Sequence, residues 1–431
     1  MKGSVIARND SDEAIYVKYK KISMELKRYK LGEIGEIRMC KRVLKEETNS
    51  VGGVPFFKIG TFGGQADVFI TKEKFEEYKN AYSYPKKGDV LISAAGTIGR
   101  TVVFDGKDAY FQDSNIVWIE NDESKVLNEY LFYCYKNIRW TTSVGSTILR
   151  LYNDDIRNTD IIVPPLSEQK KIASVLSALD DKIALNKKMN QKLEAMAKRL
   201  YDYWFVQYDF PDKNGHPYKT TGGPMTYNPS LKREIPVGWE VKQICDIAKI
   251  FNGSTPSTTE EGNYGGEIVW ITPKDLSDQN CKFVYQGARN ITQAGYDSCS
   301  TTMVPKGTVV MSSRAPIGLL SIAQCDLCTN QGFKNMVPND MTDSKYLYYT
   351  IQQHIPQIQN LGTGTTFKEV SKDELGRFAI LYPPKKLITT FEEKMAPIFD
   401  VQFNKVKEIS RLTALRDKLL PLLMNGQVIV D

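Results

Sequence analysis

The sequence is poor in the residues and motifs that catalysis requires. Its 431 residues include two histidines, His216 and His354, both in polar, proline-flanked surroundings. Neither a histidine-based catalytic triad nor a histidine-rich metal site is therefore expected. A phosphate-binding G-x-x-x-x-G-K-[ST] loop is missing, which argues against ATP-driven work. No G-x-G-x-x-G stands between a clear strand and helix, which argues against a dinucleotide site. We expect a chain that is not an enzyme and holds no cofactor or metal of its own.

Cysteine is scarce and long apolar runs are absent. The seven cysteines are scattered and odd in number, a pattern typical of free thiols in a reducing cytoplasm. Cys325 and Cys328 form one C-x-x-C, but a structural zinc needs further ligands and no second C-x-x-C exists. No run is long enough to span a membrane, and the opening "MKGSVIARNDSDE" turns acidic before an apolar leader forms. We expect a cytoplasmic protein. Its net charge of +6 does not by itself indicate nucleic-acid binding.

What the sequence does contain is one long internal repeat. "VLISAAGTIG" (residues 90–99) reappears as "VVMSSRAPIG" (309–318), a shift of 219 positions. The shift slips to 216 where "EYLFY" (129–133) meets "KYLYY" (345–349), and returns to 219 at the double prolines 164–165 and 383–384. A period this long indicates a duplicated domain with its connector, not a solenoid. Insertions fall between the matching blocks, which disfavours the alternative of a duplication kept only for size.

Each repeat begins with a globular part, residues 29–165 and 236–384. Short β-rich runs follow turns at 88–93, 115–120, 266–272 and 307–313, and helices are expected at 125–136 and 342–353. The regular βαβ rhythm of a doubly wound sheet is missing. The aspartates 154 and 373, which match in the repeat, are interpreted as helix caps or turn residues and not as nuclease carboxylates.

Each repeat ends in a long helix, at residues 166–208 and 385–426. The first has seam residues at alternating steps of four and three, as in a coiled coil: Ile172, Leu176, Leu179, Ile183, Asn186, Asn190, Leu193, Ala197, Leu200 and Trp204. The two asparagines either fix the register or face water. The second seam uses Phe391, Met395, Ile398, Leu412 and Leu419, is interrupted by Gln402 and Lys405, and should bend at Pro397. Because neither apolar stripe can stay in water, the helices should pair antiparallel.

These features resemble the specificity subunit of a type I restriction-modification enzyme. The resemblance rests on "IPVGWEVKQICDIAKIFNGSTPST", "IVWITPKDL", "RAPIG" and "VPPLSEQKKIASVLSALDDKI", within the duplicated plan. It implies an α+β fold with two similar target recognition domains, separated by two long antiparallel helices with approximate two-fold symmetry. Each domain would read one half of a bipartite, asymmetric DNA target. The helices would set the spacing and dock two methyltransferase subunits, with S-adenosylmethionine, ATP and Mg on the methyltransferase and the restriction (translocase) subunits.

The domain boundaries follow from the repeat. We expect an N-terminal extension at 1–28, recognition domain 1 at 29–165, a central helix at 166–208, a linker at 209–235, recognition domain 2 at 236–384, a distal helix at 385–426 and a tail at 427–431. The extension, with "VKYKKISMELKRYK" (17–30), matches no repeat, and a basic helix and a flexible arm both remain open. The second connector reads "PPKKLITTFEEK" and lacks the "LSEQ" of the first, so the two need not contact partners alike.

DNA contacts are expected in polar, glycine-rich loops, because Arg and Gln pair with guanine and adenine edges and Lys with phosphates. In the first domain the candidates are Lys58, Thr61, Gln65, Arg100, Gln112, Asn115, Ser146, Thr147 and Arg150. In the second they are Thr258, Lys274, Arg314, Gln331, Lys334, Thr365, Thr366 and Lys368. The alternative for each is an ordinary surface or turn residue. Gly99 and Gly318 are interpreted as turn-formers.

Partner contacts are expected near the ends of the first long helix, at Leu166, Glu168, Gln169, Trp204 and Phe205. For the aromatic cluster 201–205 a core role at the junction with a globular part is the alternative. A second overall hypothesis is a coiled-coil adaptor that joins proteins without reading DNA. A third, a self-sufficient nuclease, is disfavoured by the missing chemistry.

Overall fold

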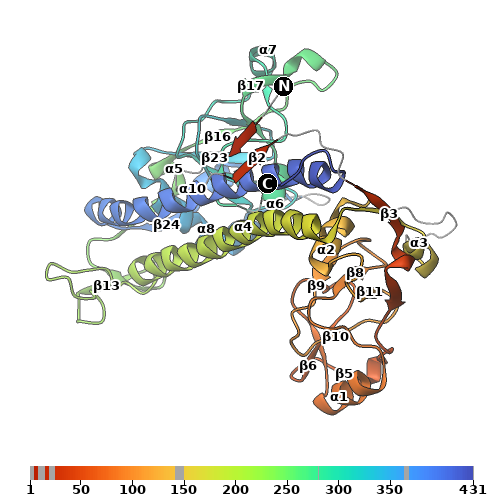
Figure 1. Cartoon of the computed structure of the whole chain (residues 1–431). Helices are drawn as coiled ribbons and strands as arrows, with labels where there is room; N and C mark the ends of the chain where they lie inside the picture. The colour runs from red at the N-terminus through yellow and green to blue at the C-terminus, as the bar shows by residue number, and fades with distance from the viewer. Residues whose placement is uncertain are drawn as a thin grey trace. The chain divides into compact units, whose positions relative to one another are not determined.

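A computed structural model describes residues 4–7, 15–18, 25–140, 150–279, 281–363 and 368–430. The chain forms two compact units, Met1–Leu185 with Ser410–Asp431 and Asn186–Ile409. Each unit holds one globular lobe and one end of each of two long helices, α4 (Leu166–Tyr201) and α10 (Lys385–Met424) (Figure 1). None of the described helices is long and apolar enough to cross a membrane.

The first lobe is built on two four-stranded sheets. One has the order β4 (Gly35–Arg38), β11 (Ile116–Asn121), β8 (Val90–Ser93) and β9 (Thr101–Val103). The other has the order β10 (Tyr110–Phe111), β6 (Val54–Phe57), β7 (Val68–Ile70) and β5 (Thr48–Asn49). The remaining elements are β12 (Asp160–Val163) paired with β3 (Lys27–Lys30), η1 (Leu31–Glu33), η2 (Lys45–Glu47), α1 (Lys72–Ala81), α2 (Asn128–Asn137) and α3 (Asn153–Arg157).

The second lobe repeats this topology. Its main sheet has the order β16 (Ala248–Asn252), β23 (Phe333–Pro338), β20 (Val309–Ser312), β21 (Leu320–Ala323) and β19 (Phe283–Val284). Its first four strands occupy the places of β4, β11, β8 and β9. Likewise β15 (Glu240–Gln243) pairs with β24 (Ala379–Tyr382) as β3 pairs with β12, and β18 (Trp270–Ile271) runs parallel to β22 (Cys328–Thr329) as β6 runs parallel to β10. The duplication seen in the sequence is thus a duplication of the fold.

Several elements complete the second lobe. They are α5 (Ile244–Ile247), η4 (Glu261–Asn263), β17 (Tyr264–Ile268), α6 (Pro273–Gln279), α7 (Gln293–Asp297), η5 (Met341–Asp343), α8 (Ser344–Leu361) and α9 (Lys372–Gly376). α8 is the counterpart of α2, and α9 that of α3. The helices expected at 125–136 and 342–353 are therefore present with shifted ends. Asp154 and Asp373 lie in the first turns of α3 and α9, but the capping contacts come from their neighbours: Asp155 accepts from Tyr152 N and Glu374 accepts from Ser371 N.

The central strands are apolar without alternation because both of their faces are buried. In β8, Val90 and Ile92 join one core cluster while Leu91 joins another on the opposite face. β20 does the same, with Val309 and Met311 on one side and Val310 on the other. Successive side chains of a strand point to opposite faces, so each main sheet is covered on both sides. The helix-side clusters include residues of α4 and α10.

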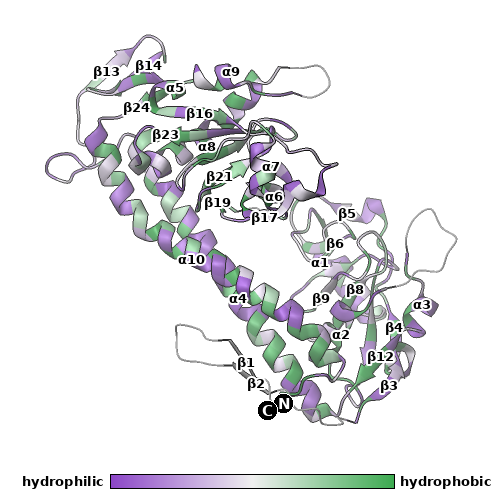
Figure 2. Ribbon diagram, turned by 90° about the horizontal axis from the view of Figure 1, so that it is seen from above, coloured by the Kyte–Doolittle hydropathy of each residue, from purple (hydrophilic) through white to green (hydrophobic). Residues whose placement is uncertain are grey.

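The two long helices pair through the expected seam, and they run antiparallel. In the first unit Leu176 and Leu179 of α4 share a core with Leu419 and Leu423 of α10. In the second unit Ala197 and Tyr201 share a core with Phe391 and Met395. Figure 2 shows apolar residues recurring along both long helices. α10 runs through Pro397 as one helix and ends at Met424, shortly before Gly426 at φ +66°.

Three expectations about this region need correction. Asn186 is 1% exposed, so a water-facing position is wrong for this residue. The basic helix considered for residues 17–30 is not formed in the described part of that stretch, because β2 (Ile15–Lys18) pairs with β1 (Ser4–Ala7) and residues 27–30 form β3. β3 pairs with β12 and spans the expected domain boundary at residue 28. The stretch 209–235 is more than a connector: β13 (Met225–Asn228) pairs with β14 (Arg233–Pro236), and the Phe210 and Tyr218 rings stack at 4.5 Å.

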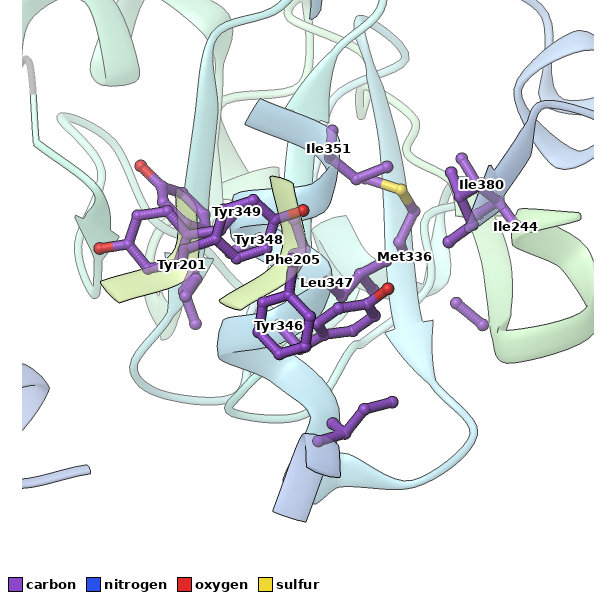
Figure 3. Close-up of a cluster of buried hydrophobic side chains, with 14 of the residues drawn as sticks. Tyr201, Phe205, Ile244, Met336, Tyr346, Leu347, Tyr348, Tyr349, Ile351 and Ile380 are labelled. Atoms are coloured by element: carbon purple, nitrogen blue, oxygen red, sulfur yellow. The ribbon is translucent and has the colours of Figure 1, made fainter. Parts of the chain in front are cut away.

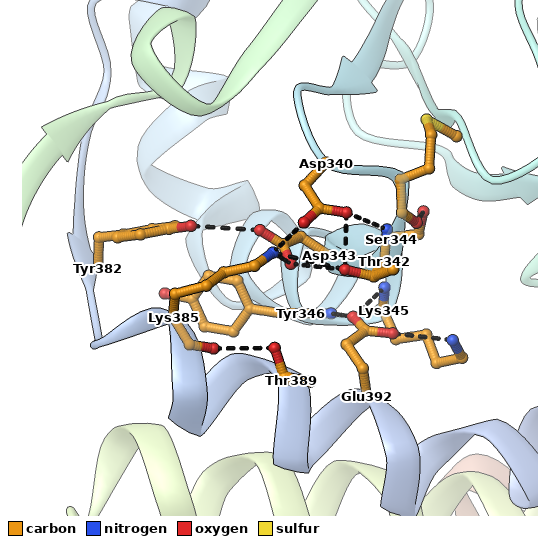
Figure 4. Close-up of polar contacts among 11 residues, drawn as sticks. Asp340, Thr342, Asp343, Ser344, Lys345, Tyr346, Tyr382, Lys385, Thr389 and Glu392 are labelled. Carbon is orange, nitrogen blue, oxygen red and sulfur yellow. Dashed lines mark hydrogen bonds and ion pairs between the residues drawn. The ribbon is translucent and has the colours of Figure 1, made fainter.

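Each long helix is fastened to a lobe at its start by a buried polar side chain. Gln169 of α4 accepts a hydrogen bond from Leu127 N at 2.8 Å and donates to the carbonyls of Lys125 and Pro164, both at 2.9 Å. Glu392 of α10 accepts from the backbone N–H groups of Lys345 and Tyr346, both at 2.8 Å, and so satisfies the first turn of α8 (Figure 4). Burial raises the pKa of Glu392, and the nearby Lys345 ammonium opposes the rise.

The junction of α4 with the second lobe is an aromatic core. After α4 a single π-helical turn, η3 (Asp202–Val206), places Trp204 and Phe205 at 3% and 6% exposure. Figure 3 shows Tyr201 and Phe205 among the tyrosines of α8. The Phe391 ring of α10 lies 4.9 Å from that of Phe205. Aromatic pairs at such distances add to the apolar area that they bury.

We predict that Phe391→Ala destabilises the chain by about 3–5 kcal/mol, because it opens a cavity in this aromatic core. Urea unfolding followed by tryptophan fluorescence measures the change. Tyr227→Ala is the matched control, since Tyr227 is 62% exposed and should change stability by less than about 0.5 kcal/mol. Equal unfolding midpoints for the two variants would contradict the role given to this core.

Candidate nucleic-acid interface

In both lobes the strand that carries the repeated phrase ends in the same tight turn. Ser93, at the end of β8, accepts from Gly99 N through its carbonyl and from Arg100 N through its hydroxyl. Ser312, at the end of β20, does the same for Gly318 N and Leu319 N. Gly99 and Gly318 have φ of +81° and +102°, where a side chain is strained. The prediction that these glycines form turns is confirmed.

The turn of the first lobe meets two other loops, and together they form the first-lobe corner (residues 58–65, 94–100, 112–115 and 150). Gln112 accepts from Ile59 N through its side chain, at 3.0 Å. Arg100 donates to the carbonyl of Phe62 at 2.9 Å, and Arg150 donates to that of Ser114 at 3.1 Å. Sequence positions as far apart as 58 and 150 therefore converge on one surface.

The structure places the first-lobe candidates as follows. Gln65 and Arg100 are exposed, and Lys58, Thr61, Gln112, Asn115 and Arg150 are partly buried. Lys58 also lies 3.8 Å from Asp67, and Thr61 donates to the Lys58 carbonyl. All seven of these candidates belong to the first-lobe corner, whereas Asp67 lies just outside it. Ser146 and Thr147 lie outside the described residues.

The second-lobe corner (residues 255–258, 271–274, 313–314, 330–334 and 368–369) is assembled in the same way. Gln331, the repeat counterpart of Gln112, accepts from the Thr255 hydroxyl. Asn330 N donates to the Ile271 carbonyl at 3.0 Å, and Ser313 N donates to that of Gly332 at 2.8 Å. Thr258, Lys274, Gln331 and Lys368 are exposed, and Arg314 is partly buried. Thr365 and Thr366 lie outside the described residues.

Lys334 does not present its ammonium to solvent as expected. Its side chain is 6% exposed, and its Nζ lies 3.1 Å from Glu369 and 3.3 Å from the Ser313 hydroxyl. Arg314 lies 3.8 Å from the same carboxylate. Glu369 therefore neutralises two of the predicted DNA contacts. The sequence offered no signal for this pairing, because Glu369 is 55 positions from Arg314 and the partners meet only through the fold.

Equivalent positions of the two corners carry different chemistry. The same antiparallel bridge joins Ala95 to Arg150 in the first lobe and Arg314 to Glu369 in the second. The repeat shift of 219 relates these two pairs. One corner thus presents an arginine where the other presents a carboxylate paired with cations. Two surfaces of one backbone design with unlike side chains suit two unlike ligands.

The residues expected to contact partners lie at the junctions of α4 with the lobes. Leu166 is 41% exposed, and Glu168 is partly exposed and 3.1 Å from Lys171. Gln169, Trp204 and Phe205 are buried, and their side chains are occupied within their own units. Burial favours the core alternative for the aromatic cluster and removes the Gln169 side chain from the accessible surface.

Cysteine and acidic chemistry offers little at this surface. The described chain contains no group of three or more His, Cys, Asp or Glu side chains placed to hold a metal ion. All seven cysteines are free thiols. Burial raises the pKa of Cys40 and that of Cys328 to about 12, so the reactive thiolate form of both is scarce at neutral pH.

We predict that Glu369→Ala destabilises the second lobe by about 2–3 kcal/mol, because it leaves the buried Lys334 ammonium without its partner. The double variant Lys334→Met, Glu369→Gln removes both charges, so no buried ammonium is left without a carboxylate partner, and it should recover most of the lost stability. Urea unfolding of both variants and the parent chain makes the comparison. A double variant no more stable than the single one would contradict the dependence of the buried Lys334 ammonium on Glu369.

The family model of the type I restriction modification DNA specificity domain matches residues 24–195 and 236–413, which is one match for each repeat. The specificity subunit of type I restriction enzyme HindI from Haemophilus influenzae is 25% identical over 93% of this chain and 99% of its own length.

Other relatives match part of the chain more strongly. A putative type I specificity subunit of Haemophilus influenzae, S.HindORF215P, is 59% identical over 150 residues, 35% of this chain and 39% of that protein. The MjaIX specificity subunit of Methanocaldococcus jannaschii is 39% identical over 41% of each chain. These two matches span less than half of the relatives' lengths.

A solved structure shares the fold. The S subunit of a type I restriction-modification system from M. genitalium superposes with a TM-score of 0.62 over 93% of this chain and 96% of that one, at 14% identity. The duplicated lobes, the paired helices and a family match over both repeats agree: this chain belongs to the type I restriction-modification DNA specificity domain family.

Proposed function

We propose that this chain is the DNA-specificity subunit of a type I restriction-modification system, in which each corner reads one half of a bipartite, asymmetric target. The helices set the spacing between the halves. The observation that carries the proposal is the pair of corners: the same turn and bridge hold Ala95 and Arg150 in one lobe and Arg314 and Glu369 in the other. A duplicated reader with unlike side chains is what a target with two unlike halves requires.

The exposed groups of the corners suit contacts to DNA. Arg100 and Gln65 in the first corner, and Gln331 and Lys368 in the second, are exposed donors on loops, and Lys274 is exposed in the first turn of α6. Arg and Gln pair bidentately with base edges, and Lys contacts phosphates. The phosphate contacts would supply a steep dependence of affinity on salt. Lys334 is left out of this set, since its charge is satisfied by Glu369.

Partners supply the chemistry in this proposal. Two methyltransferase subunits dock on the helix pair and its flanks and carry S-adenosylmethionine, and restriction subunits use ATP and Mg. Leu166 and Glu168, at the start of α4, remain proposed contacts for one methyltransferase subunit. The chain itself acts without catalysis, in the cytoplasm. The rival hypothesis, a coiled-coil adaptor without DNA reading, gives no reason for two differently charged corners on one backbone design.

We predict that Arg100→Ala weakens specific DNA binding about tenfold or more, because a base or phosphate contact of an arginine contributes about 1–3 kcal/mol. The matched control is Lys107→Ala. Lys107 lies in the turn between β9 and β10, outside the first-lobe corner, and its side chain is 85% exposed. This control should change affinity less than twofold. Gel shifts of the chain with its methyltransferase partner, at two salt concentrations, make the measurement. Equal losses in both variants would contradict reading by the first-lobe corner.

A domain exchange tests the assignment of half-sites. Replacing residues 29–165 by those of a relative should change one half of the methylated motif and leave the other half unaltered. Genome-wide methylation sequencing of cells that carry the parent or the exchanged system reads both halves directly. A motif that changes in both halves, or a parent system without a split motif, would contradict the proposal and favour the adaptor.

A further inference from the structure

A buried lysine, paired with a partly exposed glutamate, joins the second lobe to both long helices. Lys282, which precedes β19, has a side chain that is 8% exposed and pairs with Glu194 of α4. Its Nζ also donates to the Tyr349 hydroxyl of α8 at 3.0 Å and lies 3.9 Å from the ring centre of Phe399 on α10. An ammonium this far from water depends on these partners. The lobe is thus bound to one particular place along the helix pair.

Glu194 collects donors from three elements. Besides Lys282 of the lobe, its carboxylate accepts from the Tyr349 hydroxyl at 3.2 Å and from the Gln402 side-chain amide of α10 at 3.2 Å. Burial lowers the pKa of Lys282 and Glu194 opposes that shift, while burial raises the pKa of Tyr349, which stays a neutral phenol donor. The lobe, α4 and α10 therefore meet at a single carboxylate.

The same network fixes the helices against each other. Asn190 of α4 donates from its amide to the Gln402 carbonyl at 3.3 Å, and Gln402 of α10 donates to the Asn190 carbonyl at 3.3 Å. Asn186, one turn earlier in the seam, is 1% exposed and has no hydrogen-bond partner among the described residues. Polar groups in an apolar seam cost stability and make alternative registers worse, which is how they specify one register.

The first unit uses the same kind of attachment. Tyr133 of α2, the repeat counterpart of Tyr349, donates to Asp180 of α4 at 3.1 Å. Lys136 of the lobe and Arg416 of α10 pair with that carboxylate at 3.2 and 2.7 Å. Burial opposes ionisation of Asp180, yet hydrogen bonds from Arg416 and Lys136 hold its pKa below the ordinary value. A carboxylate on α4 that joins a lobe tyrosine, a lobe lysine and α10 thus occurs in both units.

We propose that Glu194, with Lys282, Tyr349, Asn190 and Gln402, forms a register lock (these five residues) that sets the position of the second lobe along the helix pair and thereby the number of unread base pairs between the two half-targets. These are positioning residues and touch no base. The inference rests on the proposed DNA-reading function and adds to it the residues that set the spacing.

The dimensions of helix and duplex give the size of the effect. A slip of one heptad moves a helix by about 10 Å, and a slip of one turn moves it by about 5.4 Å. At about 3.4 Å per base pair, the heptad slip corresponds to roughly three base pairs. The one-turn slip corresponds to roughly one to two base pairs. An apolar heptad seam would meet itself again after such a slip. The register lock would not, because Lys282 and Glu194 would part.

The test replaces the lock with apolar residues and measures spacing. In the complex with its methyltransferase subunits, the variant Lys282→Met, Asn190→Leu, Glu194→Leu, Gln402→Leu should methylate duplexes in which the gap between half-targets differs by one to three base pairs. We expect the ratio of methylation at altered gaps to that at the parental gap to rise at least tenfold. Leu200→Ala is the matched control, since Leu200 packs against the core of the second unit, and its truncation weakens the seam without removing a polar group and should keep one gap.

The methylation pattern of the fourfold variant decides between the register lock and its absence. A folded variant that methylates at the parental gap alone overturns the register lock. If the fourfold variant does not assemble, Tyr349→Phe decides, because it keeps the ring and removes one donor to Glu194. A gap preference that stays within twofold of the parental one overturns the register lock. Methylation at additional gaps supports it. Failure of the proposed function looks different, since the parent complex would then show no split motif at any gap.

Discussion

The burial of one apolar stripe determines most of this structure. Leu176 and Leu179 at one end of α4, and Ala197 and Tyr201 at the other, are nearly excluded from water, and in each unit the covering surface comes from α10. A single helix of this length with such a stripe would be exposed on its apolar side. Because the chain places a lobe before each helix, antiparallel pairing brings one helix start and one helix end to each lobe.

The fastening of the lobes to this pair is polar, although the pairing itself is apolar. Gln169 in the first turn of α4 and Glu392 about two turns into α10 satisfy backbone groups of the lobes. Asp180 and Glu194 then join lobe and helix farther along. Apolar contacts give affinity with little directional preference, whereas hydrogen bonds and ion pairs demand one geometry. A reader that must measure distance along a duplex needs the second kind of contact as well as the first.

The sequence predicted the architecture well because its signals are local or periodic. The seam steps of four and three and the double prolines depend on nearby residues, and the repeat shift of 219 follows from comparing one half of the sequence with the other. The seam from Ile172 to Trp204 is buried or partly buried as expected. The site was harder to predict. Lys334 looked like a surface cation, and its partner Glu369 lies on another segment, so its neutralisation depends on three-dimensional contact. Trp204 and Phe205 were ambiguous for the same reason.

The turn of each corner is closed in the same way in both lobes. In each, a serine at a strand end closes the turn, and a main-chain bridge, Ala95 to Arg150 or Arg314 to Glu369, ties it to the segment before α3 or α9. The bridges themselves are main-chain contacts, and the Arg150 and Glu369 side chains add further contacts, Arg150 to the Ser114 carbonyl and Glu369 to Lys334 and Arg314. Because the main chain closes each turn, exposed corner side chains such as Gln65 and Lys368 can be exchanged without altering that backbone, so recognition can diversify faster than architecture.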